Sequence, residues 1–283
     1  MGETLESRWL VFVVAGQRCA LNISDVLELN RHDAHAMVVP PGMPAVFRGV
    51  MEIRSTLTPV LDLRVALGHP SLEEETAAIQ NMLEQRREDH VRWINELEAS
   101  VREQRPFTLA TDPHQCAFGR WYDTIMADEA ELDKLTNGNT SMRHVLQRAL
   151  RAFDEPHQRI HAVATDVVQL LEEGRADKAL ERIELTRATT LNSMLTLFDR
   201  FFALIRKLRK SLVVILERHG QRLGVIVDSV HIVREIDPAA VVPPPAGVDA
   251  SGLVAGVAPA VETVDAAAGG EQREVGAGEL TLL

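Results

Sequence analysis

The spacing of apolar residues changes twice along this chain of 283 residues, and this change constrains the fold more than any other feature. Residues 9–68 and the residues after Lys210 contain short apolar or alternating runs separated by Gly and Pro, which is typical of β-strands. Residues 71–210 instead place apolar side chains three and four positions apart, which predicts α-helices. Each strand-rich part holds only about five short strands, near the lower limit for an independent β domain. We therefore expect one β domain interrupted by a helical insertion, whose first and last helices run antiparallel.

Three local signals refine this reading of the strand-rich parts. The apolar runs 212–216 and 223–228 flank His219-Gly220, which predicts a hairpin. Pro59 interrupts another run and predicts an edge strand or a bulge, because proline cannot donate to a strand ladder. Residues 265–278 are rich in Ala and Gly, so we expect a low-complexity tail.

Composition excludes several classes of protein. The net charge of −11 and pI near 5.4 argue against nucleic-acid binding, which depends on Lys and Arg at the phosphates. No run reaches the roughly 18 apolar residues of a membrane helix, and the acidic start Met1–Glu6 lacks the order of a secretory signal. We therefore expect a cytosolic protein without membrane insertion. Cys19 and Cys116 are too few for a disulfide framework and are expected to be thiols.

The segment His157-Gln-Arg-Ile-His161 is the most informative short motif. In a helix its two imidazoles lie one turn apart on the same face and can share one metal ion. The same face continues with Ala164, Val168 and Leu171, so we expect both histidines to point toward a core.

Two further side chains complete a candidate metal site. Cys116 lies in the motif His-Gln-Cys-Ala-Phe-Gly-Arg-Trp-Tyr, and His90 opens an apolar stripe that ends at Val101. Three histidines and one thiolate at inward helical positions predict a closed tetrahedral zinc site. His114 and His144 are rival ligands, with His114 only two residues from Cys116.

A catalytic zinc is disfavoured. Such a zinc needs an open position for water and usually a carboxylate base, but Gln158 stands where metalloproteases carry a Glu beside the first His. We also find no Gly-rich phosphate loop and no nucleophile–base pair. The alternative that the sequence leaves open is a purely structural zinc, with an insert that only lengthens or dimerises the protein.

Seven segments of the strand-rich parts form an ordered set: Leu10–Phe12, Ser24–Glu28, Phe47–Val50, Ile53-Arg54, Pro59–Leu63, Leu223–Val230 and Val242–Pro245. In this order they resemble CheW, the adaptor that couples chemoreceptors to the histidine kinase CheA. The resemblance implies a pair of small β-barrels, no catalysis, and contacts with a CheA-type kinase and with receptor signalling tips near Val26, Glu28 and Arg54. Arg54-Ser55 stands where many relatives have Arg-Gly, which predicts an altered turn.

The helical insertion resembles the chemoreceptor zinc-binding (CZB) domain, an antiparallel four-helix bundle. Cys116-Ala-Phe-Gly-Arg-Trp matches its Cys-x-Phe-Gly-x-Trp signature, and His157-x-x-x-His161 matches its paired histidines. The resemblance implies a zinc ion held by His90, Cys116, His157 and His161, often within a homodimer. The stretch 127–153 looks longer than is usual in the family.

We therefore predict an α+β multidomain adaptor. The expected function is non-catalytic coupling of chemoreceptors to the kinase, with a zinc-thiolate sensor of zinc or of an oxidant such as hypochlorite. Because zinc keeps a coordinating sulfur deprotonated, Cys116 is the expected redox site. The expected domains are a first β part (1–70), the helical insert (71–210), a second β part (211–262) and the tail (263–283).

Overall fold

The computed structural model describes residues 8–33, 36–244, 255–260, 263–264, 273–274 and 278–283. Contacts divide the chain into two compact units. We call them the β unit (Met1–Leu72 with Lys210–Leu283) and the helical unit (Glu73–Arg209). The β unit is thus built from both ends of the chain, and each unit has its own apolar core.

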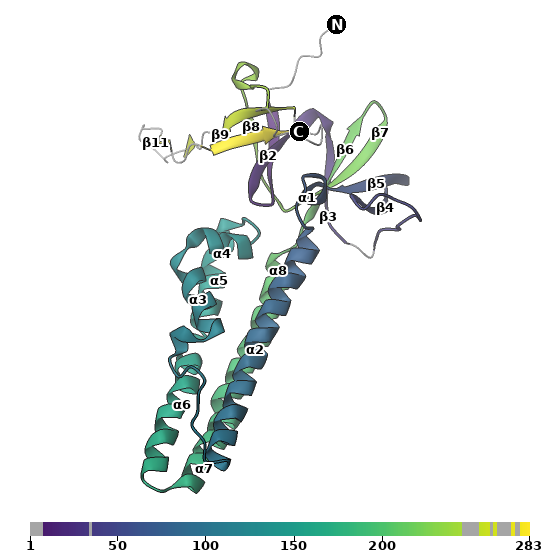
Figure 1. Cartoon of the computed structure of the whole chain (residues 1–283). Coiled ribbons are helices and arrows are strands. Elements are labelled where there is room, and N and C mark those ends of the chain that lie inside the picture. The colour runs from purple at the N-terminus through teal and green to yellow at the C-terminus, as the bar shows by residue number, and fades with distance from the viewer. Residues whose placement is uncertain (1–7, 34–35, 245–254, 261–262, 265–272, 275–277) are drawn as a thin grey trace. The chain divides into compact units, whose positions relative to one another are not determined.

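The first sheet of the β unit joins strands that precede and follow the insertion (Figure 1). Its strands lie in the order β8-β1-β2-β12-β9. β1 pairs antiparallel with both β2 and β8, whereas β12 pairs parallel with β2. The strands are β1 (Arg8–Val14), β2 (Gln17–Asn22), β8 (Ser229–Glu235), β9 (Gly256–Ala260) and β12 (Gly278–Leu282).

Strand β12 corrects the expectation that residues 263–283 are a low-complexity tail. Leu280 and Leu282 alternate along the strand, so both face the same side of the sheet. Both are buried and pack in one cluster with Trp9 and Ala20. Two-residue strands β10 (Thr263–Val264) and β11 (Arg273–Glu274) also pair with each other. The rest of the expected tail lies outside the described residues.

The second sheet has the strand order β3-β6-β7-β5-β4. β6 and β7 form the hairpin expected around His219-Gly220, and both turn residues have positive φ. Pro59 lies in β5, which β7 and β4 flank, so its interpretation as an edge residue is wrong. A bulge does occur next to it, between Phe47 and Gly49 of β4. The strands are β3 (Val26–Arg31), β4 (Phe47–Ile53), β5 (Thr56–Asp62), β6 (Leu212–Arg218) and β7 (Gln221–Val227).

A buried ion pair joins the two halves of the β unit. Nη1 of Arg64 lies 2.6 Å from Oδ2 of Asp228, and both side chains are almost fully buried. The same carboxylate accepts the backbone N–H of Ala15 at 2.8 Å. Asp62 caps the short helix that carries Arg64 by accepting the N–H groups of its first turn. The short helices of this unit are η1 (Ile23–Asp25), α1 (Leu63–Ala66) and η6 (Pro238–Ala240).

The helical unit is organised by two long antiparallel helices, α2 (Leu72–Arg102) and α8 (Asn192–Leu208) (Figure 1). Three contacts show that the helices run in opposite directions, because the residue numbers in these contacts rise along α2 as they fall toward the start of α8. The contacts join Arg209 with Thr76, Arg87 with Asp199, and Arg187 with Glu98. The expected antiparallel arrangement of the first and last inserted helices is therefore confirmed.

Shorter helices complete the unit. α7 continues through a π-helical turn (Arg187–Leu191) into α8, so the two form one helical column. The other elements are η3 (Pro113–Gln115), α3 (Ala117–Ala127), α4 (Glu129–Leu135), η4 (Thr140–Met142), α5 (Arg143–Arg151), α6 (Asp154–Glu172) and α7 (Ala176–Thr186).

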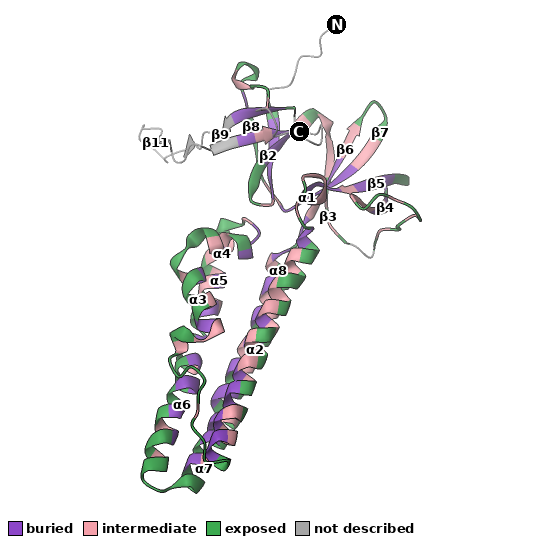
Figure 2. Ribbon diagram, viewed as in Figure 1, coloured by how far each residue is buried: buried purple, intermediate pink, exposed green. Residues whose placement is uncertain are grey.

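The buried face of α6 is only partly the one expected. His157, His161 and Ala164 are buried as predicted, but Val168 and Leu171 are 51% and 41% exposed. The ribbon of α6 accordingly carries both buried and exposed residues along its length (Figure 2). Val168 and Leu171 line an open groove of about 470 Å³ whose other walls include Leu97 and Phe107. The buried face of α6 is therefore completed by the neighbouring residues Ile160, Val163 and Val167.

Candidate metal centre

His90 presents one ring nitrogen to the interior of the helical unit. It lies on α2 and is 3% exposed. Its Nδ1 lies 2.7 Å from the carbonyl oxygen of Arg86, one turn earlier, and must donate to it because a carbonyl only accepts. This bond fixes the tautomer and leaves Nε2 without a proton. Nε2 is buried and has no hydrogen-bond partner.

His157 and His161 face His90 from α6. Burial is the main cause that lowers the pKa of His157 to about 3 and that of His161 to about 4. Both imidazoles are therefore neutral near pH 7, which is the form that binds a metal. Both ring nitrogens of His161 are buried without a hydrogen-bond partner. Such buried and unpaired nitrogens are costly unless a ligand occupies them.

Cys116 reaches the same point from the start of α3. It is the N-cap residue of this helix, and its Sγ accepts the N–H of Gly119 at 3.1 Å. Sγ also lies 3.2 Å from Nε2 of His157. Burial raises the pKa of the Cys116 thiol, while the N–H groups of Gly119 and Phe118 oppose that rise. The position at a helix N-terminus favours a negative sulfur.

Gly119 explains part of the motif around the cysteine. A Cβ atom built on Gly119 would lie 1.9 Å from the carbonyl oxygen of Pro113. No side chain fits there, because the turn η3 packs directly on the first turn of α3. Glycine at this position therefore brings the turn close enough to hold Cys116 at the N-cap.

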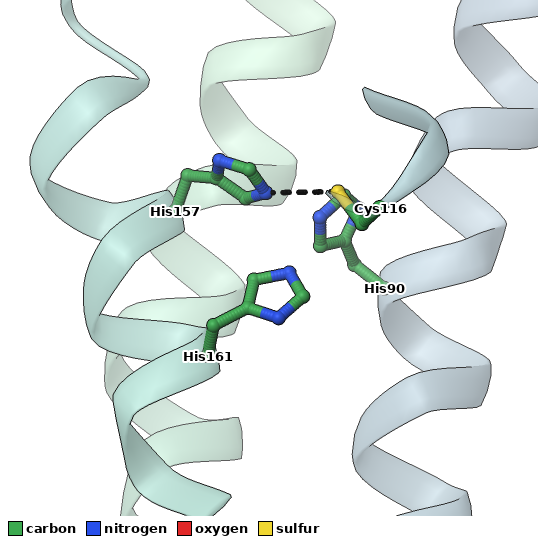
Figure 3. Close-up of side chains that lie close together, drawn as sticks. All are labelled: His90, Cys116, His157 and His161. Atoms are coloured by element: carbon green, nitrogen blue, oxygen red, sulfur yellow. Dashed lines mark hydrogen bonds between the residues drawn. The ribbon is translucent and has the colours of Figure 1, made fainter. Parts of the chain in front are cut away.

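The four side chains converge on one point between α2, α3 and α6 (Figure 3). One candidate ligand atom from each of His90, Cys116, His157 and His161 lies within 4.8 Å of the other three. Donors around a tetrahedral zinc are about 3.5 Å apart, given zinc–ligand bonds of about 2.0–2.3 Å. The farthest pair must therefore approach by only roughly an ångström. Unpaired buried nitrogens, neutral imidazoles and a thiol donor together fit zinc.

Aromatic rings enclose the cluster. Phe118 lies with its ring centroid 5.0 Å from that of His157, and Trp93 with its centroid 4.9 Å from that of His161. Nε1 of Trp93 also donates to the carbonyl of Ala110 at 2.8 Å, which ties the connection leading to Cys116 onto α2. Sequence reasoning could not find this role of Trp93, because its bond to Ala110 joins positions 17 apart.

The two rival histidines lie outside the cluster. His114 is exposed and its Nδ1 lies 2.9 Å from Oδ2 of Asp123, a contact that raises the pKa of His114. His144 is exposed on α5. Within the described part of the chain, the four residues named above form the one group of three or more His, Cys, Asp or Glu side chains with this geometry.

The three residues expected to bind partners lie close together in the second sheet. Val26 and Glu28 belong to β3, and Glu28 Oε2 lies 2.6 Å from Nη2 of Arg54. Arg54 and Ser55 form the whole β4–β5 turn and both have positive φ, 48° and 61°. The turn therefore has a tight left-handed geometry that is made without glycine. Leu57, which follows the turn, was not anticipated and is 74% exposed.

Two sheets interrupted by a helical insert, with a closed His/Cys cluster inside the insert, define a scaffold with a metal-binding domain. Comparison with known families agrees. The CheW-like domain model matches residues 8–89 and 194–263, and the chemoreceptor zinc-binding (CZB) domain model matches residues 90–168. The first match covers more than half of the chain, so the protein belongs to the CheW-like family, split around a zinc-binding domain.

Other comparisons add little to this assignment. The crystal structure of the scaffolding protein TtCheW from Thermoanaerobacter tengcongensis is similar over 99% of this chain and 85% of that chain. The two share 14% identity with a TM-score of 0.40. No curated protein matches the chain. Among the described residues, no helix combines the length and apolar character needed to cross a bilayer.

The family matches define the coarse function. The protein is a non-catalytic adaptor of the chemotaxis type that carries a zinc-binding sensor domain. Zinc is its cofactor, and the donor cluster in the helical unit is positioned for a metal.

Proposed function

We propose that this adaptor couples chemoreceptor signalling tips to a CheA-type histidine kinase and that its helical unit senses zinc or an oxidant. The observation that carries the proposal is the His/Cys cluster inside a domain whose two ends both join the adaptor fold. A change in that domain can then reach the β unit through two covalent links rather than one. Adaptors of this kind act in the cytosol, and that location is part of the proposal.

We propose that His90, Cys116, His157 and His161 hold one zinc ion. Four protein donors fill a tetrahedral sphere and leave no position for a substrate water, which agrees with a non-catalytic role. When bound, zinc keeps the coordinating sulfur deprotonated. The bond from His90 Nδ1 to the Arg86 carbonyl supports the assignment, because it aims the unprotonated Nε2 inward.

Cys116 is the proposed site of oxidation. In the net reaction with hypochlorous acid, a sulfur–oxygen bond forms as the oxygen–chlorine bond breaks. Sulfur is oxidised, chlorine leaves as chloride, and the proton stays on the sulfenic oxygen. A sulfenic acid is a weaker ligand than a thiolate, so the start of α3 would no longer be held against His157 and could move.

The proposed partner surface surrounds the Glu28–Arg54 ion pair. Val26 lies two positions from Glu28 on β3 and is half-buried, and Leu57, three positions after Arg54, is exposed. Apolar side chains around a charged pair are typical of protein interfaces. The strained turn at Arg54 adds support, because backbone strain clusters at functional sites. Arg54→Ala should weaken binding of kinase or receptor without unfolding the β unit, whereas Arg18→Ala on the other sheet should leave binding unchanged.

The finer architecture is also part of the proposal. Four helical columns, formed by α2, α3 to α5, α6, and α7 with α8, support a four-helix bundle. Two five-stranded sheets support a pair of small barrels. The proposed domain boundaries lie at 70/71 and 210/211. The division of the chain by contacts at 72/73 and 209/210 supports them.

A structural zinc, with an insert that only lengthens or dimerises the adaptor, is the competing function. The two differ in whether the state of the metal changes partner binding. The deciding experiment measures zinc content and kinase binding for the wild-type protein before and after chelation, with Cys116→Ala alongside. The sensor proposal expects about one zinc per chain and kinase binding that changes on chelation. Stability that depends on zinc, together with kinase binding that does not change, would contradict the sensor role and support the structural role. Wild-type protein that contains no zinc would contradict both roles.

A further inference from the structure

A buried arginine holds together three segments at one end of the helical unit. The Arg209 side chain is 1% exposed and lies directly after α8. Its Nε donates to Oγ1 of Thr76 at 2.9 Å, and its Nη2 lies 2.5 Å from Oε2 of Glu75. Its Nη1 donates to the backbone carbonyl of Lys134. One guanidinium thus joins the first turns of α2, the end of α8 and the last turn of α4.

The chemistry of the site requires an arginine. The last carbonyls of a helix have no N–H partner within the helix, and that of Lys134 accepts from both the N–H of Asn137 and Arg209. A buried cation must be paired, and Glu75 supplies the charge. A planar guanidinium spreads its donors over three nitrogens and so reaches three separate acceptors, whereas a lysine ammonium carries all its donors on one nitrogen. Removal of this side chain therefore breaks the polar link between α4 and the other two segments without removing a helix.

The site lies at both covalent links between the units. The chain enters the helical unit at residues 72–73 and leaves it at 209–210. Glu75 and Thr76 follow the first link closely, and Arg209 is the last residue before the second.

The same site is also continuous with the metal centre. Cys116 is the N-cap of α3, and only Asp128 separates the end of α3 from the start of α4. Leu132 and Leu135 of α4 are buried in the core, and so is Thr136 after it. One extended residue, Asp128, joins α3 to α4, and we call the stretch from Cys116 to the Lys134 carbonyl the α3–α4 limb.

We propose that Arg209 is the positioning residue that transmits a displacement of the α3–α4 limb to the two chain links. The inference rests on the proposed zinc site, because it takes loss of Cys116 ligation as the event that releases the limb. When the Lys134 carbonyl moves, the guanidinium either moves with it or loses its hydrogen bond to that carbonyl. In both cases its bonds to Glu75 and Thr76 change, so both links respond together. Coupling of this kind is reciprocal, so a change at the links also alters zinc affinity.

Hydrogen exchange with mass spectrometry on the full chain tests the inference, with zinc-loaded and chelated protein compared. In the wild type, chelation should speed exchange at least threefold in residues 129–137 and also in 72–78 and 205–211. In Arg209→Met, which keeps the alkyl stem, the change should remain in 129–137 and disappear from the two link segments. The matched control is Arg187→Met, because Arg187 ties the other end of the long helices through Glu98 but does not touch α4. It should behave as the wild type.

Glu75→Gln provides a second variant if Arg209→Met does not fold, and it should reduce the response of the link segments while zinc uptake persists. Link segments that respond equally in Arg209→Met and wild type would overturn the role of Arg209. The role is also overturned if wild-type protein takes up zinc but hydrogen exchange in its link segments does not change on chelation. Wild-type protein that takes up no zinc instead contradicts the zinc site itself, and with it the trigger assumed here.

Discussion

Sγ of Cys116 lies 3.2 Å from Nε2 of His157, although the two residues are 41 positions apart. The contact joins the first turn of α3 to α6, and the N–H of Gly119 holds the sulfur from the other side. A sulfur in this position can be a metal ligand and can also control where α3 begins. The proposed ligand and the start of the α3–α4 limb are therefore the same residue, which is what a sensor of thiolate chemistry requires.

His161→Ala should lower zinc affinity by well over tenfold, because it removes one of four donors and opens the site to water. Competition with a chromophoric chelator measures the affinity. His144→Ala is the matched control, since His144 is exposed on α5 of the same unit, and its zinc affinity should equal that of the wild type. Equal affinities for both variants would contradict the ligand set.

Gly119→Ala should also lower zinc affinity, by about tenfold or more, although residue 119 is not a ligand. The added Cβ would lie 1.9 Å from the Pro113 carbonyl oxygen, so the turn before Cys116 must move. Gly174→Ala is the control, because Gly174 has a φ of 73° but no atom within 4 Å of an added Cβ. It should cost about 1 kcal/mol of stability and leave zinc binding intact. A Gly119→Ala protein with wild-type affinity would show that the turn can relax freely.

The sequence could predict that His157 and His161 point toward one another's neighbourhood in the core, because helix geometry fixes which residues share a face. His157 and His161 are one turn apart, so their common direction follows from spacing alone. Spacing does not tell what covers a face, and for this reason Val168 and Leu171, on the same stripe, are exposed beside a groove.

Contacts between distant positions were beyond sequence reasoning. Arg209 meets Thr76 and Lys134, which lie 133 and 75 positions away. Composition also concealed β12, because the alternation of Leu280 and Leu282 spans only a few residues beside an Ala- and Gly-rich stretch.

The ion pair between Glu28 and Arg54 should appear in a pH titration. A hydrogen bond from Asn30 is the largest cause that lowers the pKa of Glu28, and the charge of Arg54 adds to it. A carboxyl with a lowered pKa stabilises the fold above its unfolded pKa, near 4.5, and this contribution is lost as pH falls through the folded pKa. Arg54→Gln should therefore raise the pKa of Glu28 toward its ordinary value. The stability that Glu28 contributes should then be smaller, and it should be lost over a narrower pH range that begins near pH 4.5 and ends at a higher pH than in the wild type. Carboxyl chemical shifts followed by NMR give the pKa, and an identical titration in both proteins would show that the pair does not form in solution.

The two cysteines should differ sharply in reactivity. Burial, together with the charge of Asp228, raises the pKa of Cys19 to about 12, and the side chain is fully buried in β2. Its thiolate fraction is therefore negligible below about pH 9, since the thiolate falls tenfold for each unit below the pKa. Cys116 is only half-buried and is held as a thiolate when zinc is bound.

Brief treatment with substoichiometric hypochlorite, followed by peptide mass spectrometry, should place the oxidation on Cys116 and leave Cys19 unmodified. Cys19→Ser serves as the control and should give the same yield at Cys116. Kinase binding measured on the same samples connects the chemistry to function, and Cys116→Asp, which cannot form a sulfenic acid, should show no response to the oxidant. Oxidation that falls mainly on Cys19 would contradict the expected order of reactivity. Kinase binding that stays constant while Cys116 is oxidised would contradict the sensor role and leave the zinc site with a structural role.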